Sequence, residues 1–178
     1  MRKFLLTIFA AIIFSAPLVV TAQSDWKARV AQTMPLMGHR NWILIVDSAY
    51  PLQSSPGVET IETNASQLDV LRSVLGTINS SIHVRPLIYM DKELPFVGDD
   101  DAPGASAYRD QVQKLLADYT IETMLHERVI SQIDETSKEF HVLVLKTTMT
   151  IPYSSVFIRL DCKYWSADSE RRMRQRMH

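Results

Sequence analysis

The sequence has little cysteine and little glycine, and each scarcity argues against a class of protein. Cys162 is the single cysteine, so no internal disulfide can form and an apolar core must stabilise the chain. The five glycines form no Gly-rich phosphate-binding motif. Histidine and cysteine also lack the paired spacing of zinc ligands. We therefore expect neither a nucleotide-phosphate loop nor a metal site.

Charge of one sign is not in excess either. The net charge is −1, from 19 Lys and Arg against 20 Asp and Glu, which argues against a nucleic-acid-binding surface. The acidic run at residues 99–101 lacks regular ligand spacing and is predicted to be a solvated turn. Residues 166–178 are rich in arginine and are predicted to form a basic, amphipathic tail helix.

Residues 1–22 are predicted to be a signal peptide. Arg2 and Lys3 precede an apolar stretch from Phe4 to Val20, and small residues at Val20-Thr21-Ala22 offer a cleavage site before Gln23. An uncleaved anchor is the alternative, because the stretch is near the lower limit of about 17 residues for crossing a bilayer. We expect cleavage, export from a bacterial cytoplasm to the periplasm or medium, and no stable membrane insertion afterwards.

Helical and strand-like patterns alternate through the rest of the chain. Helices are expected near residues 25–33, 66–78, 105–118, 125–137 and 166–177, and strands near 42–46, 83–90, 120–123, 140–147 and 153–160. Pro86 indicates an edge or an irregularity in the second of these strands. The order predicts a single three-layer α/β/α domain over residues 23–165, with helices on both faces of the sheet.

Two ionisable residues flank the first predicted strand. His39 precedes Trp42–Val46, and Asp47 follows it at the start of a Pro- and Ser-rich loop that extends to Gly57. Since five residues of strand span about 16 Å, His39 and Asp47 lie at opposite ends unless the flanking loops fold back. They meet in one site either through such a loop or across a subunit boundary. Polar groups at strand ends often carry the chemistry of α/β proteins.

Several motifs, in order, resemble the ribose pyranase and fucose mutarotase family of sugar isomerases. The resemblance covers roughly residues 34 to 162, and its order and spacing make it specific. The motifs are Gly38-His39, Asp47-Ser48 with Pro51, Arg85-Pro86-Leu87-Ile88-Tyr89-Met90, Tyr108-Arg109, His126-Glu127-Arg128, Lys146-Thr147, and Pro152-Tyr153-Ser154-Ser155-Val156.

The resemblance implies a cofactor-free isomerase that interconverts anomers or ring forms of a fucose- or ribose-like monosaccharide. Ring opening needs a base for the anomeric hydroxyl and an acid for the ring oxygen, and histidine can serve as either near neutral pH. The family also forms ring-shaped homo-oligomers, often decamers, with sites between subunits. The implied catalytic residues are His39, Asp47 and Tyr153, and the implied sugar-binding residues are His126, Ser155 and Arg109.

Departures from the family pattern leave two other functions open. Ser155 stands where the family has asparagine, Asp161 replaces a glycine, and the basic tail extends past the usual end. Export is also unusual for enzymes that serve cytoplasmic sugar metabolism. A non-catalytic, exported sugar-binding module is the first alternative. The second is an interaction protein that keeps the fold and uses its tail helix to bind a partner.

Overall fold

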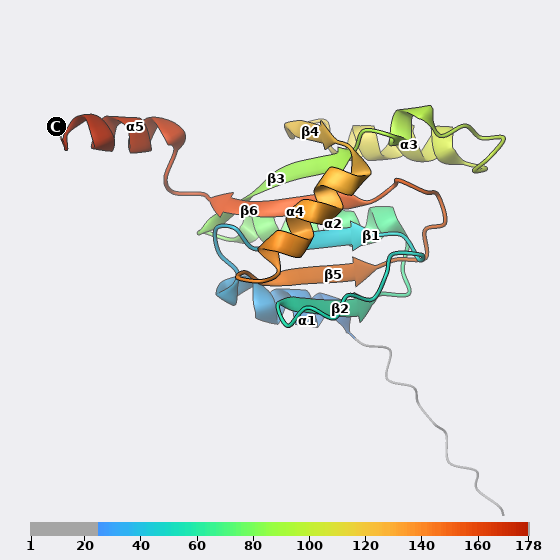
Figure 1. Ribbon diagram of the computed structural model, residues 1–178, viewed down its shortest axis with the longest axis horizontal. Helices are drawn as coiled ribbons and strands as arrows, with labels where there is room; N and C mark the ends of the chain where they lie inside the picture. Colours follow the sequence, from blue (N-terminus) through green and yellow to red (C-terminus); the bar gives the residue numbers. More distant parts are fainter. Residues whose placement is uncertain (1–24, 178) are drawn as a thin grey trace, which may run out of the picture.

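A six-stranded sheet forms the centre of the protein (Figure 1). The computed structural model describes residues 25–177. The strands are β1 (Trp42–Val46), β2 (Val58–Glu62), β3 (Val84–Asp91), β4 (Ile121–Met124), β5 (Val142–Lys146) and β6 (Val156–Cys162). They are arranged in the order β2-β5-β1-β6-β3-β4. Five strands run in one direction, and β6 lies antiparallel between β1 and β3. The carboxyl ends of the five therefore meet the amino end of β6 at one end of the sheet, called here the carboxyl end.

Helices cover both faces of the sheet. They are α1 (Trp26–Thr33), α2 (Gln67–Ser80), α3 (Ala105–Leu115), α4 (His126–Thr136) and α5 (Ala167–Gln175), with short 3₁₀ turns η1 (Met34–Leu36) and η2 (Leu94–Phe96). In Figure 1, α4 crosses the near face, and α1 and α2 lie behind the sheet. One apolar cluster joins α1, α2 and α3 to one face, and a second joins α4 to the other. The predicted three-layer α/β/α class is confirmed.

Strand β1 is the most buried part of the sheet because both of its faces are covered. Ile43 and Ile45 pack into the cluster with α1, α2 and α3, whereas Leu44 packs with Val129 and Ile133 of α4. All five residues of β1 are buried. Such a continuous apolar run is typical of a strand covered on both sides.

The predicted helix starts and the predicted effect of Pro86 are confirmed. Asp25, Ser66 and Ser166 each accept a hydrogen bond from a backbone N–H of the first helical turn, at α1, α2 and α5 respectively. Strand β4 pairs only with the Ile88–Asp91 part of β3. The other half of β3 therefore has an unpaired side, and Pro86 lies there, where its missing N–H costs no ladder hydrogen bond.

Strand β2 is absent from the sequence prediction. It follows the predicted loop of residues 47–57 and pairs in parallel with β5 at the edge of the sheet. None of its residues is fully buried, and two of the five are glutamates. Its apolar signal is therefore too weak for a pattern-based prediction.

The C-terminal helix stands apart from the sheet domain. Helix α5 has no buried residue and projects from the domain at the end of β6 (Figure 1). Within residues 25–177, no helix is long and apolar enough to cross a membrane. The predicted signal peptide, residues 1–22, lies outside the described residues.

Candidate functional site

A cleft of about 450 Å³ opens at the carboxyl end of the sheet. Three segments form it, namely the loop after β1, the start of α4 and the loop before β6. Its lining residues are Asp47, Ser48, Ala49, Tyr50, Pro51, His126, Thr150, Ile151, Pro152 and Tyr153. Ligands of α/β proteins bind in this position, outside the carboxyl ends of strands.

His126 is held in the cleft by two carboxylates. Its backbone N–H donates to Glu93 at 3.0 and 3.2 Å from the two carboxylate oxygens, which satisfies an open N–H at the start of α4. Its Nδ1 lies 3.1 Å from Oδ2 of Asp91. The imidazole also meets the ring of Tyr153 edge to face, with centroids 5.5 Å apart. No hydrogen bond to Nε2 of His126 occurs within residues 25–177, so that nitrogen can bind a molecule in the cleft.

Asp91 is a site residue that the sequence analysis missed. It ends β3 and is 1% exposed, and its Oδ1 has no hydrogen-bond partner among the described residues. Burial raises the pKa of Asp91 to about 6, although the neighbouring His126 opposes the shift. The available signal was an acidic residue directly after the apolar run of a predicted strand.

Tyr153 is positioned by a buried network behind the cleft. Its φ is +57°, in the left-handed region, so the turn needs support from its surroundings. The carbonyl oxygen of Ser154 accepts hydrogen bonds from the side chains of Gln67 and Tyr108, the latter at 2.6 Å. Oγ of Ser154 donates to the carbonyl oxygen of Ile151 at 2.7 Å. The sequence analysis did not single out Gln67, whose role depends on contacts far away in sequence.

Asp47 and Tyr50 form the opposite wall. Oδ1 of Asp47 accepts from the N–H of Ala49 at 2.8 Å, a loop-start cap. Tyr50 is 4% exposed, and its hydroxyl has no hydrogen-bond partner in the described chain. Burial, with the negative charges of Asp134, Asp91 and Asp47, raises the pKa of Tyr50, so its hydroxyl stays protonated. Lys146 donates to the carbonyl oxygen of Tyr50 at 2.7 Å and fixes this wall to β5.

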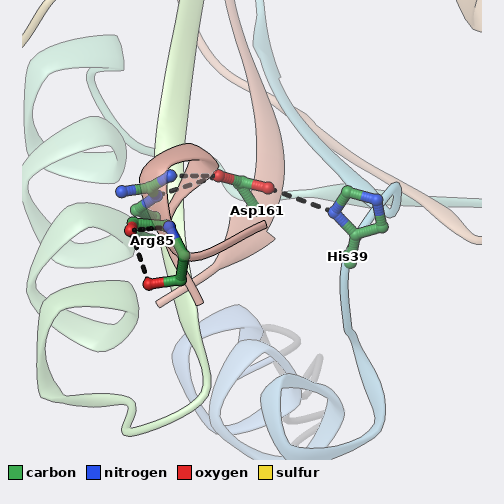
Figure 2. A network of polar contacts seen from close by, with 5 residues as sticks. His39, Arg85 and Asp161 are labelled. Atoms are coloured by element: carbon green, nitrogen blue, oxygen red, sulfur yellow. Dashed lines mark hydrogen bonds and ion pairs between the residues drawn. The ribbon is translucent and has the colours of Figure 1, made fainter. Parts of the chain in front are cut away.

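His39 lies before β1, at the end of the sheet opposite the cleft, and contacts Asp161 (Figure 2). Its Nδ1 is 3.1 Å from Oδ1 of Asp161, and Oδ2 of Asp161 accepts from Arg85 at 2.9 and 2.6 Å. Burial acts to raise the pKa of Asp161, but hydrogen bonds from Arg85, the Cys162 backbone and His39 together hold it below its usual value. The loops around β1 do not fold back, so His39 and Asp47 remain at opposite ends of the strand.

Two other predicted sugar-binding residues lie outside the cleft. Arg109 donates to the carbonyl oxygen of Val97 at 2.6 Å and to Oγ of Ser106 at 2.8 Å, which fixes the loop before α3. Ser155 is 1% exposed and does not line the cleft. The single chain therefore brings together Asp47, His126 and Tyr153 of the predicted set and separates His39, Arg109 and Ser155 from them.

The cleft contains groups for proton transfer and hydrogen bonding. His126 lines the cleft and contacts the buried carboxylate of Asp91, whose pKa is raised, and Asp47 and Tyr153 can bind hydroxyl groups. Within residues 25–177 no three His, Cys, Asp or Glu residues cluster in a way that could hold a metal ion.

The fold and the site define a mixed α/β protein with an acid/base cleft at the carboxyl end of its sheet. Residues 26–162 match the model of the RbsD / FucU transport protein family, so the chain belongs to the RbsD/FucU family. No curated protein sequence matches the chain.

Solved structures of this family share the fold at low sequence identity. RbsD of Bacillus subtilis, complexed with D-ribose, is 14% identical with a TM-score of 0.55, covering 75% of this chain and 92% of that chain. The fucose mutarotase of Streptococcus pneumoniae, in complex with L-fucose, is 20% identical with a TM-score of 0.51, covering 73% and 89%. FucU of Bifidobacterium longum is 14% identical with a TM-score of 0.52, covering 75% and 92%.

Proposed function

We propose that this protein is a sugar mutarotase or pyranase, an isomerase that interconverts anomers or ring forms of a monosaccharide. The observation that carries the proposal is the His126–Asp91 pair, whose histidine lies beside Asp47 and Tyr153 in the cleft of an RbsD/FucU family member. A volume of about 450 Å³ lies in the range of small-molecule sites. The D-ribose and L-fucose bound to two structural relatives favour a pentose or a 6-deoxyhexose.

The reaction needs only proton transfers. A base removes the proton of the anomeric hydroxyl, the bond between the anomeric carbon and the ring oxygen breaks, and the ring oxygen takes up a proton. The open chain then rotates and closes in the reverse sense. Asp47 and Tyr153 would hold sugar hydroxyls, and His126 would contact the reacting end. No oxidant or reductant takes part.

A second proton-transfer group would come from another subunit. By family resemblance His39 is a general acid/base, yet it lies at the opposite end of β1 from the cleft. A homo-oligomeric ring, such as a decamer, would bring His39 of one subunit to the cleft of the next. We also propose export to the periplasm or medium, on the basis of residues 1–22.

A non-catalytic sugar-binding module is the second candidate. Ser155 takes the place of the family's asparagine and is buried away from the cleft, so one expected amide contact to the sugar is missing. Such a module would bind a sugar without accelerating its isomerisation.

Anomer exchange measured by NMR separates these functions. The purified protein is mixed with ribose, fucose or galactose, and magnetisation transfer between anomers is compared with buffer and with His39→Ala. Exchange above buffer that is lost in His39→Ala supports the isomerase. Perturbed sugar signals without faster exchange support the binding module, and no effect with any sugar contradicts both. Sedimentation velocity on the same samples measures the oligomer.

A further inference from the structure

Asp91 is a buried carboxylate with an unusual set of contacts. Its side chain is fully buried, and its one hydrogen-bond partner within residues 25–177 is Nδ1 of His126, at 3.1 Å. The second oxygen, Oδ1, has no partner among the described residues. Buried carboxylates in proteins are normally paired with a cation and hydrogen-bonded through both oxygens. The burial of Asp91 therefore carries a free-energy cost.

The charges around Asp91 increase that cost. Its acidic neighbours are Glu93 and Asp47, and both raise its pKa. No lysine or arginine side chain in the described part of the chain forms an ion pair with it. Among the described side chains, the one that offsets its charge is His126, which lines the cleft. Asp91 is therefore connected to the cleft through this histidine.

The segment that contains Asp91 holds His126 in two places. Asp91 contacts the ring, and Glu93, two residues on, accepts from the backbone N–H. The two carboxylates thus hold His126 at the first residue of the 11-residue helix α4. The position of the imidazole therefore depends on the segment that ends β3.

We propose that Asp91 is a positioning residue that directs Nδ1–H of His126 toward itself and leaves Nε2 to exchange the proton of a sugar hydroxyl. The proposal rests on the proposed isomerase function and assigns proton transfer to His126, a residue that the family resemblance implies only as a sugar-binding group. In the step itself Nε2 takes the proton of the anomeric hydroxyl as the bond to the ring oxygen breaks. The ring oxygen takes a proton from the second acid/base group, which the proposed function assigns to His39 of a neighbouring subunit. Asp91 keeps its hydrogen bond throughout.

Asp91→Asn is the variant that tests this role. Asparagine has nearly the same shape but carries no charge, and its NH₂ group can face Nδ1 and favour the other tautomer. We expect the kcat of anomer exchange to fall at least ~10-fold, with a smaller change in KM. The dependence of the rate on an ionisation near pH 6 should also disappear. Asp110→Asn, an exposed carboxylate on α3, is the matched control and should leave the rate unchanged.

Nitrogen-15 NMR of the His126 ring provides a readout that does not need catalysis. In the unaltered protein Nδ1 should carry the proton and Nε2 the lone pair at neutral pH, and Asp91→Asn should shift that balance. An unchanged tautomer together with an unchanged rate would overturn the proposal. If no sugar is isomerised, the proposed function fails, while the tautomer still reports whether Asp91 orients His126.

A second variant covers the case in which Asp91→Asn does not fold. In His126→Gln the titration of Asp91 can be followed through its carboxyl carbon signal. Loss of the histidine should raise the pKa of Asp91, because His126 now lowers it. A titration that is the same with and without His126 would contradict the coupling on which the proposal depends.

Discussion

The two ends of the sheet each carry a histidine–carboxylate pair, and the pairs differ in their surroundings. His126–Asp91 and His39–Asp161 have the same contact distance, 3.1 Å. The Asp91 side chain is 0% exposed and has no cationic partner besides the histidine within residues 25–177, whereas the Asp161 side chain is 19% exposed and bonded to Arg85. The pKa of Asp91 is accordingly raised and that of Asp161 lowered.

The difference shows that the contact alone does not define the role of such a pair. Arg85 keeps the carboxylate of Asp161 ionised, so that carboxylate can orient His39 but is a poor proton acceptor near neutral pH. Asp91 has no such cation and titrates close to the range in which histidine does. The two carboxylates therefore differ: Asp161 stays ionised beside Arg85 and can orient His39, whereas the buried Asp91 has a raised pKa and no arginine beside it within residues 25–177.

Removing the cleft histidine should have the largest effect. We expect His126→Gln to reduce the rate of anomer exchange about 100-fold, because the proton-transfer group is lost. His141→Gln is a matched control, since His141 lies before β5 at the opposite end of the sheet from the cleft. Retention of more than half the rate in His126→Gln, with the control also active, would show that the cleft pair does not carry the chemistry.

A mixing experiment asks whether the two pairs work together across subunits. His39→Ala and His126→Gln are each expected to be inactive, but each keeps the other histidine. If one subunit supplies His39 to the cleft of the next, co-refolding equal amounts should restore about a quarter of the sites. Activity no higher than the sum of the two separate variants would mean that the pairs never share a site.

The main elements of the fold follow from the sequence because their signals are local. Apolar periodicity predicts helices that start near Asp25, Ser66 and Ser166, and the structure confirms these starts and shows each of the three side chains capping its helix. Strand β1 is a continuous apolar run, and its length already places His39 and Asp47 at opposite ends. Strand β2 lies beyond such reasoning, since its half-exposed, glutamate-containing sequence is ordered by pairing with β5.

The site is less predictable because its contacts join distant parts of the chain. Asp91 meets His126 from 35 residues away, and Gln67 reaches Ser154 from 87 residues away. Asp47, His126 and Tyr153 could be selected by resemblance to family motifs, yet the same resemblance also selected Arg109 and Ser155, which lie elsewhere. A sequence motif shows which residue types recur in a family. Whether such a residue lines the cleft depends on how the chain packs.

A smaller effect is expected at Tyr50, in the wall of the cleft at the carboxyl end of the sheet. Its buried hydroxyl has no partner in the described chain, so we expect Tyr50→Phe to raise the free energy of unfolding by about 1 kcal/mol, measured by urea denaturation. If the hydroxyl binds sugar, the same variant should weaken sugar affinity. A loss of stability instead would indicate that the hydroxyl is hydrogen-bonded in the folded protein.

The smallest effect on stability is expected at the His39–Asp161 pair. There the informative quantity is the direction in which the stability of the variant changes with pH. The pKa of Asp161 is lowered in the folded state, so its contribution to stability is present above the ordinary value near 3.8 and is lost as the pH falls. Asp161→Asn should therefore cost less than about 1 kcal/mol at pH 7, and the cost should shrink as the pH falls below the ordinary value of the carboxyl. The pKa of Asp91 is raised to about 6, so the stability associated with that residue is lost as the pH rises from about 4 to 6. As the pH rises from about 4 to 6, Asp91→Asn should become more stable relative to the unaltered protein. As the pH rises through the lower range in which Asp161 ionises, Asp161→Asn should become less stable relative to it. Denaturant unfolding at several pH values measures both, and shifts of the same sign would mean that the two carboxylates do not differ as their surroundings require.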